Sequence, residues 1–233
     1  RLSGSDAMPV VGAVTGSKRE RDCFAAASPD LDLRCSGASP ARAETLAKTL
    51  ADRGCAGLLS IGLAGALDPA LHPGDVVLSS TIIAPDGAKV PASEAWRDRI
   101  AADLEGAGIR FRIGAIAGLD ELVRLAETKR ALFSGTGAVA VDMESHAVMR
   151  IAAAAGLPFL SVRVIADSAT DEVPRAAASA LNAEGGVAVF RLLGALLMRP
   201  RDIAGMTMLA RRSTKGFEML RRIALLGSLL RPV

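Results

Sequence analysis

The sequence predicts an α/β fold: a single domain with a mostly parallel, mixed central sheet flanked by helices, and a helical extension at its C-terminal end. Short apolar runs bounded by turn residues alternate with helical patterns, which is typical of βαβ units. Half of the 233 residues are hydrophobic, enough for one substantial core. We expect residues 1–7 to be an expression remnant, residues 8–198 to form the domain and residues 199–233 to form a basic, amphipathic helical extension.

The first half of the chain is expected to alternate between strands and helices. Apolar composition predicts strands at Pro9–Thr15, Leu31–Cys35, Ala56–Ile61 and Val76–Ile83. One helix is expected from the Gly16-Ser17 turn to Ala27. A second runs to Arg53, with Ser39 as N-cap, Pro40 in the first helical position and Gly54 ending it. The segment Gly62–Gly65 is expected as a turn whose backbone amides lie open to a ligand.

The second half repeats the pattern. Helices are expected over Ser93–Gly106, Leu119–Phe133, Met143–Ala155 and from Pro174 to about Met198, and strands over Phe111–Ala117, Val139–Val141 and Phe159–Ile165. The last of these strands is almost wholly apolar, as a central parallel strand should be. Arg163 interrupts it, and a buried arginine needs a carboxylate partner, for which Glu144 and Asp167 are the candidates.

Cysteine and histidine usage favours a reduced, cytoplasmic protein without a structural metal. The cysteines Cys23, Cys35 and Cys55 are too few and too scattered for a disulfide framework, and no charged segment followed by an apolar core precedes the first strand. The histidines His72 and His146 stand 74 positions apart with no Cys-x-x-Cys nearby, so the sequence does not cluster zinc ligands.

The charge is unevenly distributed. Residues 188–233 contain nine Lys or Arg against two Asp or Glu, whereas the rest contains 19 against 23. With no Tyr, one Trp and six Phe the chain has few stacking platforms, so we expect no nucleic-acid partner. No run reaches the roughly 20 apolar residues of a membrane span. The basic amphipathic tail suits peripheral contact with anionic lipid at the inner membrane face, or else covers the core or an oligomer interface.

Two carboxylates are expected at the edge of the sheet where open α/β folds hold their ligands. Glu144 opens a helix and Asp167 closes a strand, which suggests proton-transfer chemistry. Structural alternatives remain for both: Glu144 as a first-turn acid that complements the helix dipole, and Asp167 as a helix N-cap before Ser168–Thr170. Glu20 lies in a mixed charge run that is usually a solvated face, and His146 is more simply a packed helix residue.

These residues resemble the nucleoside phosphorylase and methylthioadenosine nucleosidase superfamily. The resemblance rests on Asp142-Met143-Glu144, on Arg163–Asp167, and on Ser60–Pro69 followed by Pro73–Val77, and it extends from Val10 to about Pro174. It implies an enzyme that cleaves the N-glycosidic bond of a purine nucleoside. It also implies a homo-oligomer, because members of this superfamily usually complete their sites across symmetric subunits.

The resemblance implies a role for each acid. Asp167 would protonate the purine at N7, Glu144 and Met143 would hold the ribose, and Glu20 would orient the attacking water. A partly desolvated carboxyl group at the end of an apolar strand is suited to hold such a proton. We therefore take Asp167 and Glu20 as the candidate catalytic residues.

Phosphate remains open as a co-substrate, and no other cofactor is expected. Gly62 and Gly65 are candidate substrate-binding positions, but neither Gly-x-Gly-x-x-Gly nor a Gly-Lys-Ser/Thr motif accompanies them. In phosphorylases that the chain resembles, a Ser or Thr that contacts phosphate stands where this chain has Leu63. Alternative phosphate donors lie in the first loop: Thr15, Ser17, Lys18 and Arg19.

Two departures point to an unusual substrate. Leu119, Leu122 and Val123 stand where the superfamily usually places an aromatic residue against the base, so the pocket would be aliphatic. With this aliphatic pocket, the basic apolar tail and the sequence of Gly137–Ala147, the chain is similar to the hopanoid-associated branch of the superfamily. That resemblance implies release of adenine from the lipid adenosylhopane. The alternatives are a nucleosidase or phosphorylase for small soluble nucleosides such as methylthioadenosine or S-adenosylhomocysteine, and a noncatalytic nucleoside-binding scaffold.

Overall fold

The computed structural model describes residues 10–25, 27–173 and 202–232. The expected expression remnant over residues 1–7 and the expected helix over residues 174–198 lie outside these ranges. Within them the strands are β1 (Val11–Thr15), β2 (Leu31–Cys35), β3 (Leu58–Ala66), β4 (Val76–Ile83), β5 (Lys89–Pro91), β6 (Phe111–Gly118), β7 (Ala140–Asp142) and β8 (Phe159–Asp167). The helices are α1 (Lys18–Ala25), α2 (Pro40–Asp52), α3 (Glu94–Gly106), α4 (Ala126–Thr136), α5 (Ser145–Ala155) and α8 (Asp202–Ile223), and a 3₁₀ turn follows at Gly227–Leu230.

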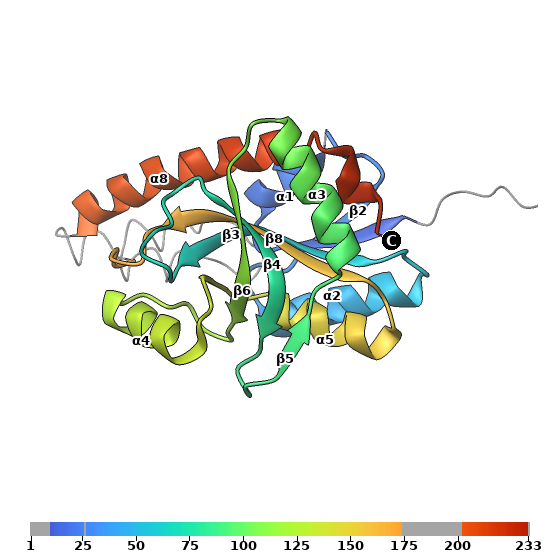
Figure 1. The fold of residues 1–233 in the computed structure, drawn as a ribbon, viewed down its shortest axis with the longest axis horizontal. Helices are drawn as coiled ribbons and strands as arrows, with labels where there is room; N and C mark the ends of the chain where they lie inside the picture. Colours follow the sequence, from blue (N-terminus) through green and yellow to red (C-terminus); the bar gives the residue numbers. More distant parts are fainter. Residues whose placement is uncertain (1–9, 26, 174–201, 233) are drawn as a thin grey trace, which may run out of the picture.

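The strands form one mixed sheet that closes on itself. Its order is β2-β1-β3-β7-β6-β4-β5, and β8 pairs with both β3 and β4, so that β3, β7, β6, β4 and β8 make a ring (Figure 1). The pairs β1–β2, β1–β3, β3–β8, β4–β6 and β6–β7 are parallel, while β3–β7, β4–β5 and β4–β8 are antiparallel. This confirms the expected single α/β domain with a mixed sheet between helices.

The partner of β3 changes along its length, and this change creates the site. Residues Gly12 to Val14 of β1 pair with Leu58 to Ser60 of β3, whereas β7 pairs only with Gly65 and Ala66 of β3. Between these two stretches, among the residues that the structure describes, one side of β3 has no strand beside it. Strand β1 lies before this stretch of β3 and β7 lies after it, both on the same side, whereas β8 pairs along the other side of β3.

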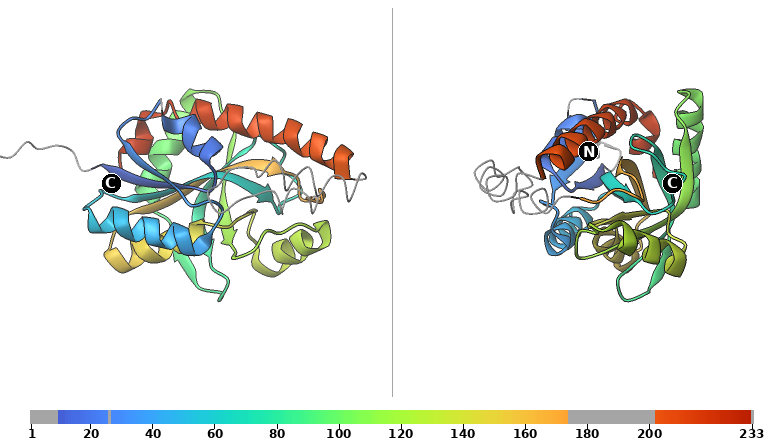
Figure 2. Two further views of the ribbon diagram at one scale, coloured as in Figure 1. Left: turned by 180° about the vertical axis from the view of Figure 1, so that it is seen from behind. Right: turned by 90° about the vertical axis from the view of Figure 1, so that its left-hand side faces the viewer.

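Helices cover both faces of the sheet. Helices α1, α3 and α8 pack on one face, where their apolar side chains meet Leu59, Ile61 and Val162, and α2 and α5 pack on the other around Leu58 and Ile165. Figures 1 and 2 show these two layers with the sheet between them, and α4 set at the edge. Alternate residues of β3 and β8 thus face opposite cores, which puts Gly62 and Arg163 on the α2 and α5 side.

Several boundaries are confirmed. Strands β2 and β4 have the expected limits, and the Ser39 side chain caps α2 by accepting a hydrogen bond from the Arg42 N–H at 3.3 Å. Gly54, just past that helix, adopts φ of +77°, a conformation that glycine adopts without strain.

Other expectations were wrong. Gly62–Gly65 is not a turn but part of β3, which continues to Ala66 because β8 pairs with it along this stretch. The expected helix over Leu119–Phe133 begins only at Ala126; the Leu119 N–H bonds instead to the carbonyl of Asp142, and the Arg124 carbonyl accepts the Val173 N–H. Helix α5 starts at Ser145 rather than Met143, and strand β5 was not expected.

The C-terminal segment is built into the core. Phe217, Leu220 and Ile223 of α8 are buried in the same apolar cluster as β8 and α1. The Ser28 hydroxyl donates to the Ala224 carbonyl at 2.6 Å, and the Trp96 indole N–H donates to the Ser228 carbonyl at 3.1 Å. This supports the alternative in which the tail covers the core. No helix in the described residues has the length and apolar character needed to span a membrane.

Candidate active site

Glu20 is buried at the start of α1 and holds two chain segments together. Its Oε2 accepts the Ser17 N–H at 2.5 Å while the Glu20 N–H donates to the Ser17 hydroxyl at 3.2 Å, which is a capping box. Its Oε1 accepts the Leu63 N–H from β3 at 2.7 Å. The alternative in which Glu20 belongs to a solvated charge run is therefore wrong, since the capping box turns its carboxylate inward.

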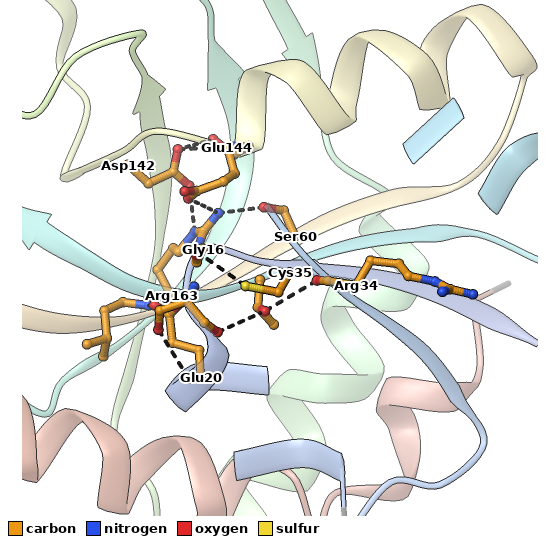
Figure 3. A network of polar contacts seen from close by, with 12 residues as sticks. Gly16, Glu20, Arg34, Cys35, Ser60, Asp142, Glu144 and Arg163 are labelled. Carbon is orange, nitrogen blue, oxygen red and sulfur yellow. Dashed lines mark hydrogen bonds and ion pairs between the residues drawn. The ribbon is translucent and has the colours of Figure 1, made fainter. Parts of the chain in front are cut away.

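Arg163 is the centre of the site. The side chain is completely buried on β8; its Nε lies 2.5 Å from Asp142 Oδ2, and its Nη2 donates to the Ser60 hydroxyl at 2.5 Å and lies 3.7 Å from Glu144 Oε2. Figure 3 shows the guanidinium between Ser60 on one side and the two carboxylates on the other. The expected Glu144 partnership is confirmed, but Asp142 is the closer partner.

Two glycines make room for this cluster. A Cβ on Gly62 would lie 2.7 Å from Glu20 Oε1 and 2.9 Å from Arg163 Nη1, and a Cβ on Gly16 would lie 2.8 Å from Glu144 Oε1 and 3.2 Å from Glu20 Oε2. Glu20, Glu144 and Arg163 are thus neighbours packed against bare backbone. Gly62 is needed for this close approach rather than for an exposed turn.

The electrostatics of the cluster favour protonated carboxyl groups. Burial raises the pKa of Glu20, with the Leu63 N–H and Arg163 opposing the shift. Burial also raises the pKa of Glu144 to about 8, and the nearby Asp142 and Glu20 carboxylates add to the effect while Arg163 opposes it. Near neutral pH these acids are therefore able to hold or exchange a proton.

Asp142 has a structural role that the sequence motif did not reveal. Its Oδ1 accepts hydrogen bonds from the N–H of Ser145 at 3.1 Å and from the Ser145 hydroxyl at 2.6 Å. It therefore fixes the start of α5, and with it Glu144, while its other oxygen meets Arg163.

Asp167 ends β8, where it lies opposite Gly65 of β3 past a bulge in the pairing, and it is buried. Its Oδ2 pairs with the ammonium of Lys129 from α4, a side chain with no exposed surface. Lys129 also donates to the carbonyls of Ser168 at 2.9 Å and Asp171 at 3.0 Å. A Cβ on Gly65 would lie 3.3 Å from Asp167 Oδ2, so β3 also approaches this carboxylate closely.

Of the remaining expected site residues, Met143 stands next to the acids in the chain, whereas the side chains of Leu63, Leu122 and Val123 lie elsewhere. Met143 is half-buried between Asp142 and Glu144. The Leu63 side chain instead faces α8, where a Cβ on Gly216 would lie 2.7 Å from it, so only its backbone serves the cluster. In the loop before α4, Leu122 is exposed and Val123 belongs to a small apolar cluster with Ala117 and Val141.

Lys129, a neighbour of the site, was not found by sequence reasoning, whereas the prediction of His146 as a packed helix residue is confirmed. Lys129 carries no local signal, because a lysine on a surface helix normally faces water. His146 is buried with its Nε2 3.2 Å from Asp120 Oδ1, and Gly118 provides the space for it: a Cβ there would lie 2.8 Å from the His146 Nδ1. The histidine thus lies in the first turn of α5, two residues after Glu144, and pairs with Asp120.

Known proteins resemble this chain in sequence and in fold. Residues 33–196 match the phosphorylase superfamily. A 5'-methylthioadenosine/S-adenosylhomocysteine nucleosidase from Marinomonas sp. is 30% identical over 138 residues, 51% of this chain and 59% of that protein, so the match spans about three fifths of the relative's length. The nucleosidase of the same description from Mycobacterium bovis is 26% identical over 59% of this chain and 69% of its own.

Solved structures share the fold at low identity. The native futalosine hydrolase of Helicobacter pylori superposes with a TM-score of 0.70 at 16% identity, covering 92% of this chain and 97% of its own. The methylthioadenosine/S-adenosylhomocysteine nucleosidase of Campylobacter jejuni has a TM-score of 0.69 at 15% identity, covering 93% and 99%. Since the family match covers most of the chain and the fold agrees with it, this protein belongs to the phosphorylase superfamily.

Proposed function

We propose that this protein is an enzyme that hydrolyses the N-glycosidic bond of a purine nucleoside. The observation that carries the proposal is the buried cluster of Glu20, Glu144 and Arg163 beside the end of β8, where Asp167 stands. Breaking a glycosidic bond needs a proton for the leaving base and a guided nucleophile, and this cluster has acids for both tasks. Superfamily membership supports the same chemistry.

Each acid has a distinct task in the proposed reaction. Asp167 protonates the base as the bond from the sugar to the base breaks. Glu144, whose pKa lies near 8, holds the sugar hydroxyls, because a neutral carboxyl group both donates and accepts hydrogen bonds as a hydroxyl does. Glu20 takes the proton of the attacking water, a task for which the pKa of this carboxyl group, raised by burial, is suited. Met143 lies beside the sugar.

Water rather than phosphate is the proposed nucleophile. The Thr15 hydroxyl is buried and lies 3.3 Å from the carbonyls of Ser17 and Arg34, and the Arg19 guanidinium lies over the Phe217 ring, 4.1 Å from its centre. Leu63 has no hydroxyl to offer. These first-loop groups therefore have intramolecular partners in place of a phosphate ion.

The proposed substrate is a small adenine nucleoside of the methylthioadenosine type. The relatives' descriptions name such nucleosides, so they fit this alternative better than adenosylhopane. Adenosylhopane stays a second candidate on one observation: the exposed Leu122 presents aliphatic surface in the loop before α4. Membrane contact and a homo-oligomer remain predictions.

Adenine release tests the proposal directly. Methylthioadenosine, S-adenosylhomocysteine, inosine and adenosylhopane should be supplied side by side, with and without phosphate, and free base quantified by chromatography. We expect release from methylthioadenosine at a rate independent of phosphate, with free methylthioribose as the sugar product. A sugar 1-phosphate would contradict hydrolysis, and binding without turnover of any of the four would support a noncatalytic scaffold instead.

A further inference from the structure

Lys129 occupies an unusual place for a lysine. It is the one fully buried side chain of α4, whose apolar residues Leu132 and Phe133 pack only partly buried against the domain. Burying an ammonium is costly unless it is paired and hydrogen-bonded, and an apolar side chain would dock a helix at lower cost. A role beyond docking accounts for a charge at this position.

The contacts of Lys129 show what the charge does. An ammonium group has three N–H donors, and here they have three acceptors: Asp167 Oδ2 and the carbonyls of Ser168 and Asp171. The two carbonyls belong to the turn that directly follows Asp167. The lysine therefore ties α4 to the end of β8 and holds the carboxylate in one direction.

An ammonium in contact with a carboxylate favours the ionised form of that carboxylate. The other charged groups on the surrounding elements are Arg163 on β8, Asp142 on β7, Glu127 and Arg130 on α4, Arg124 before it, and Asp171 and Glu172 after β8. Arg163 is engaged by Asp142 and Glu144, and Asp171 turns its Oδ2 to the Ser168 N–H at 2.8 Å. Among the residues that the structure describes, Lys129 is the cation that contacts the Asp167 carboxylate.

We propose that Lys129 is a positioning residue that keeps Asp167 ionised and fixed in direction in the ligand-free protein. This inference rests on the proposed function, in which Asp167 delivers the proton to the base. The proton is then taken from solvent when the nucleoside binds, passes to the base as the bond from the sugar carbon to the base nitrogen breaks, and is balanced by the proton that the attacking water gives up. The sum of these steps is hydrolysis with no net change in protons beyond the ionisation of the products.

The test is a carbon-13 NMR titration of aspartate carboxyl groups in the full chain, with the Asp167 signal assigned by its loss in Asp167→Asn. In the unsubstituted protein we expect Asp167 to stay ionised from pH 5 to 8. In Lys129→Met its titration midpoint should rise by about one to three pH units. Lys129→Arg, which keeps the charge, should remain close to the unsubstituted protein, and Lys48→Met, which breaks the exposed pair with Asp52, should leave the signal unchanged.

A protonated Asp167 at pH 7 in the unsubstituted protein overturns the proposal, as does an unchanged midpoint in folded Lys129→Met. If Lys129→Met does not fold, Lys129→Gln, which removes the charge but keeps a polar side chain, takes its place, with the same rise in the midpoint expected and an unchanged midpoint overturning the proposal. The titration needs no substrate, so its outcome is independent of whether the protein releases a base. In a protein that does, Lys129→Met should also move the alkaline limb of kcat/KM to higher pH.

Discussion

Asp142 and Arg163 form a buried ion pair, with Arg163 Nε 2.5 Å from Asp142 Oδ2, that joins the end of β7 to the middle of β8. The same aspartate caps α5 through Ser145, and the same arginine reaches Glu144. The contact between Asp142 and Arg163 thus sets the position of the start of α5, and with it that of Glu144 and of the Arg163 guanidinium. The site depends on this pair for its geometry as much as for its charge.

Removing Arg163 should destabilise the fold strongly. In Arg163→Met the carboxylates of Asp142 and Glu144 lose their buried cation, and breaking such a pair costs about 3–5 kcal/mol. The free energy of unfolding in urea measures the loss. Arg150→Met is the matched control, because its pair with Asp86 is exposed and should change stability by less than about 1 kcal/mol. Equal effects in the two variants would contradict this role of Arg163.

Gly62→Ala should impair the site through a single methyl group. The added Cβ would fall 2.7 Å from Glu20 Oε1 and 2.9 Å from Arg163 Nη1, both parts of a buried network with little room to shift. We expect a loss of about 1–3 kcal/mol in stability together with reduced base release. Gly106→Ala, at the end of α3, meets no atom within 4 Å and should be neutral or slightly stabilising. Full activity of Gly62→Ala would show that the cluster is not tightly packed.

The buried acids predict how stability changes with pH. Because the pKa of Glu144 rises from 4.5 to about 8 on folding, the native state binds more protons than the unfolded chain between these values. Stability therefore falls as pH rises from about 5 to 8, and Glu20, whose pKa is also raised, contributes in the same direction. Urea unfolding at pH 5, 6.5 and 8 checks the trend. Glu144→Gln should flatten it, and an identical slope in both proteins would refute the assignment.

The C-terminal helix should be essential to the domain. Leu220 is fully buried against the sheet, so Leu220→Ala should cost about 2–5 kcal/mol, whereas Leu225→Ala, at a position 75% exposed, should cost almost nothing. Thermal or urea unfolding of the two variants compares them directly. If Leu220→Ala were as harmless as its control, the tail would be an appendage and not part of the core.

Local signals predicted most of the fold. Turn residues and caps marked the limits of β2, β4 and α2, because Ser39, Pro40 and Gly54 act on their immediate neighbours. The continuation of β3 through Gly62–Gly65 was missed, since it depends on pairing with β8 a hundred residues away. The glycines predicted a turn on their own but are required by long-range packing.

The site was predictable in its acids and less so in their partners. Asp142–Glu144 and Arg163–Asp167 lie in recognisable segments, so the sequence alone points to Glu144 and Asp167 as candidates. That Asp142 is the nearest partner of Arg163 follows from the pairing of β7 with β3, and the burial of Lys129 follows from how α4 docks. Neither relationship has a signal at the level of spacing or composition.

The central claim is that Asp167 delivers a proton to a departing purine, and Asp167→Asn tests it most directly. Asparagine keeps the size and the hydrogen-bonding shape of the side chain but cannot donate that proton. We expect the variant to keep the circular dichroism spectrum of the unsubstituted protein while adenine release from methylthioadenosine falls by about 10²–10⁴-fold. Release at an undiminished rate from folded Asp167→Asn would contradict the account.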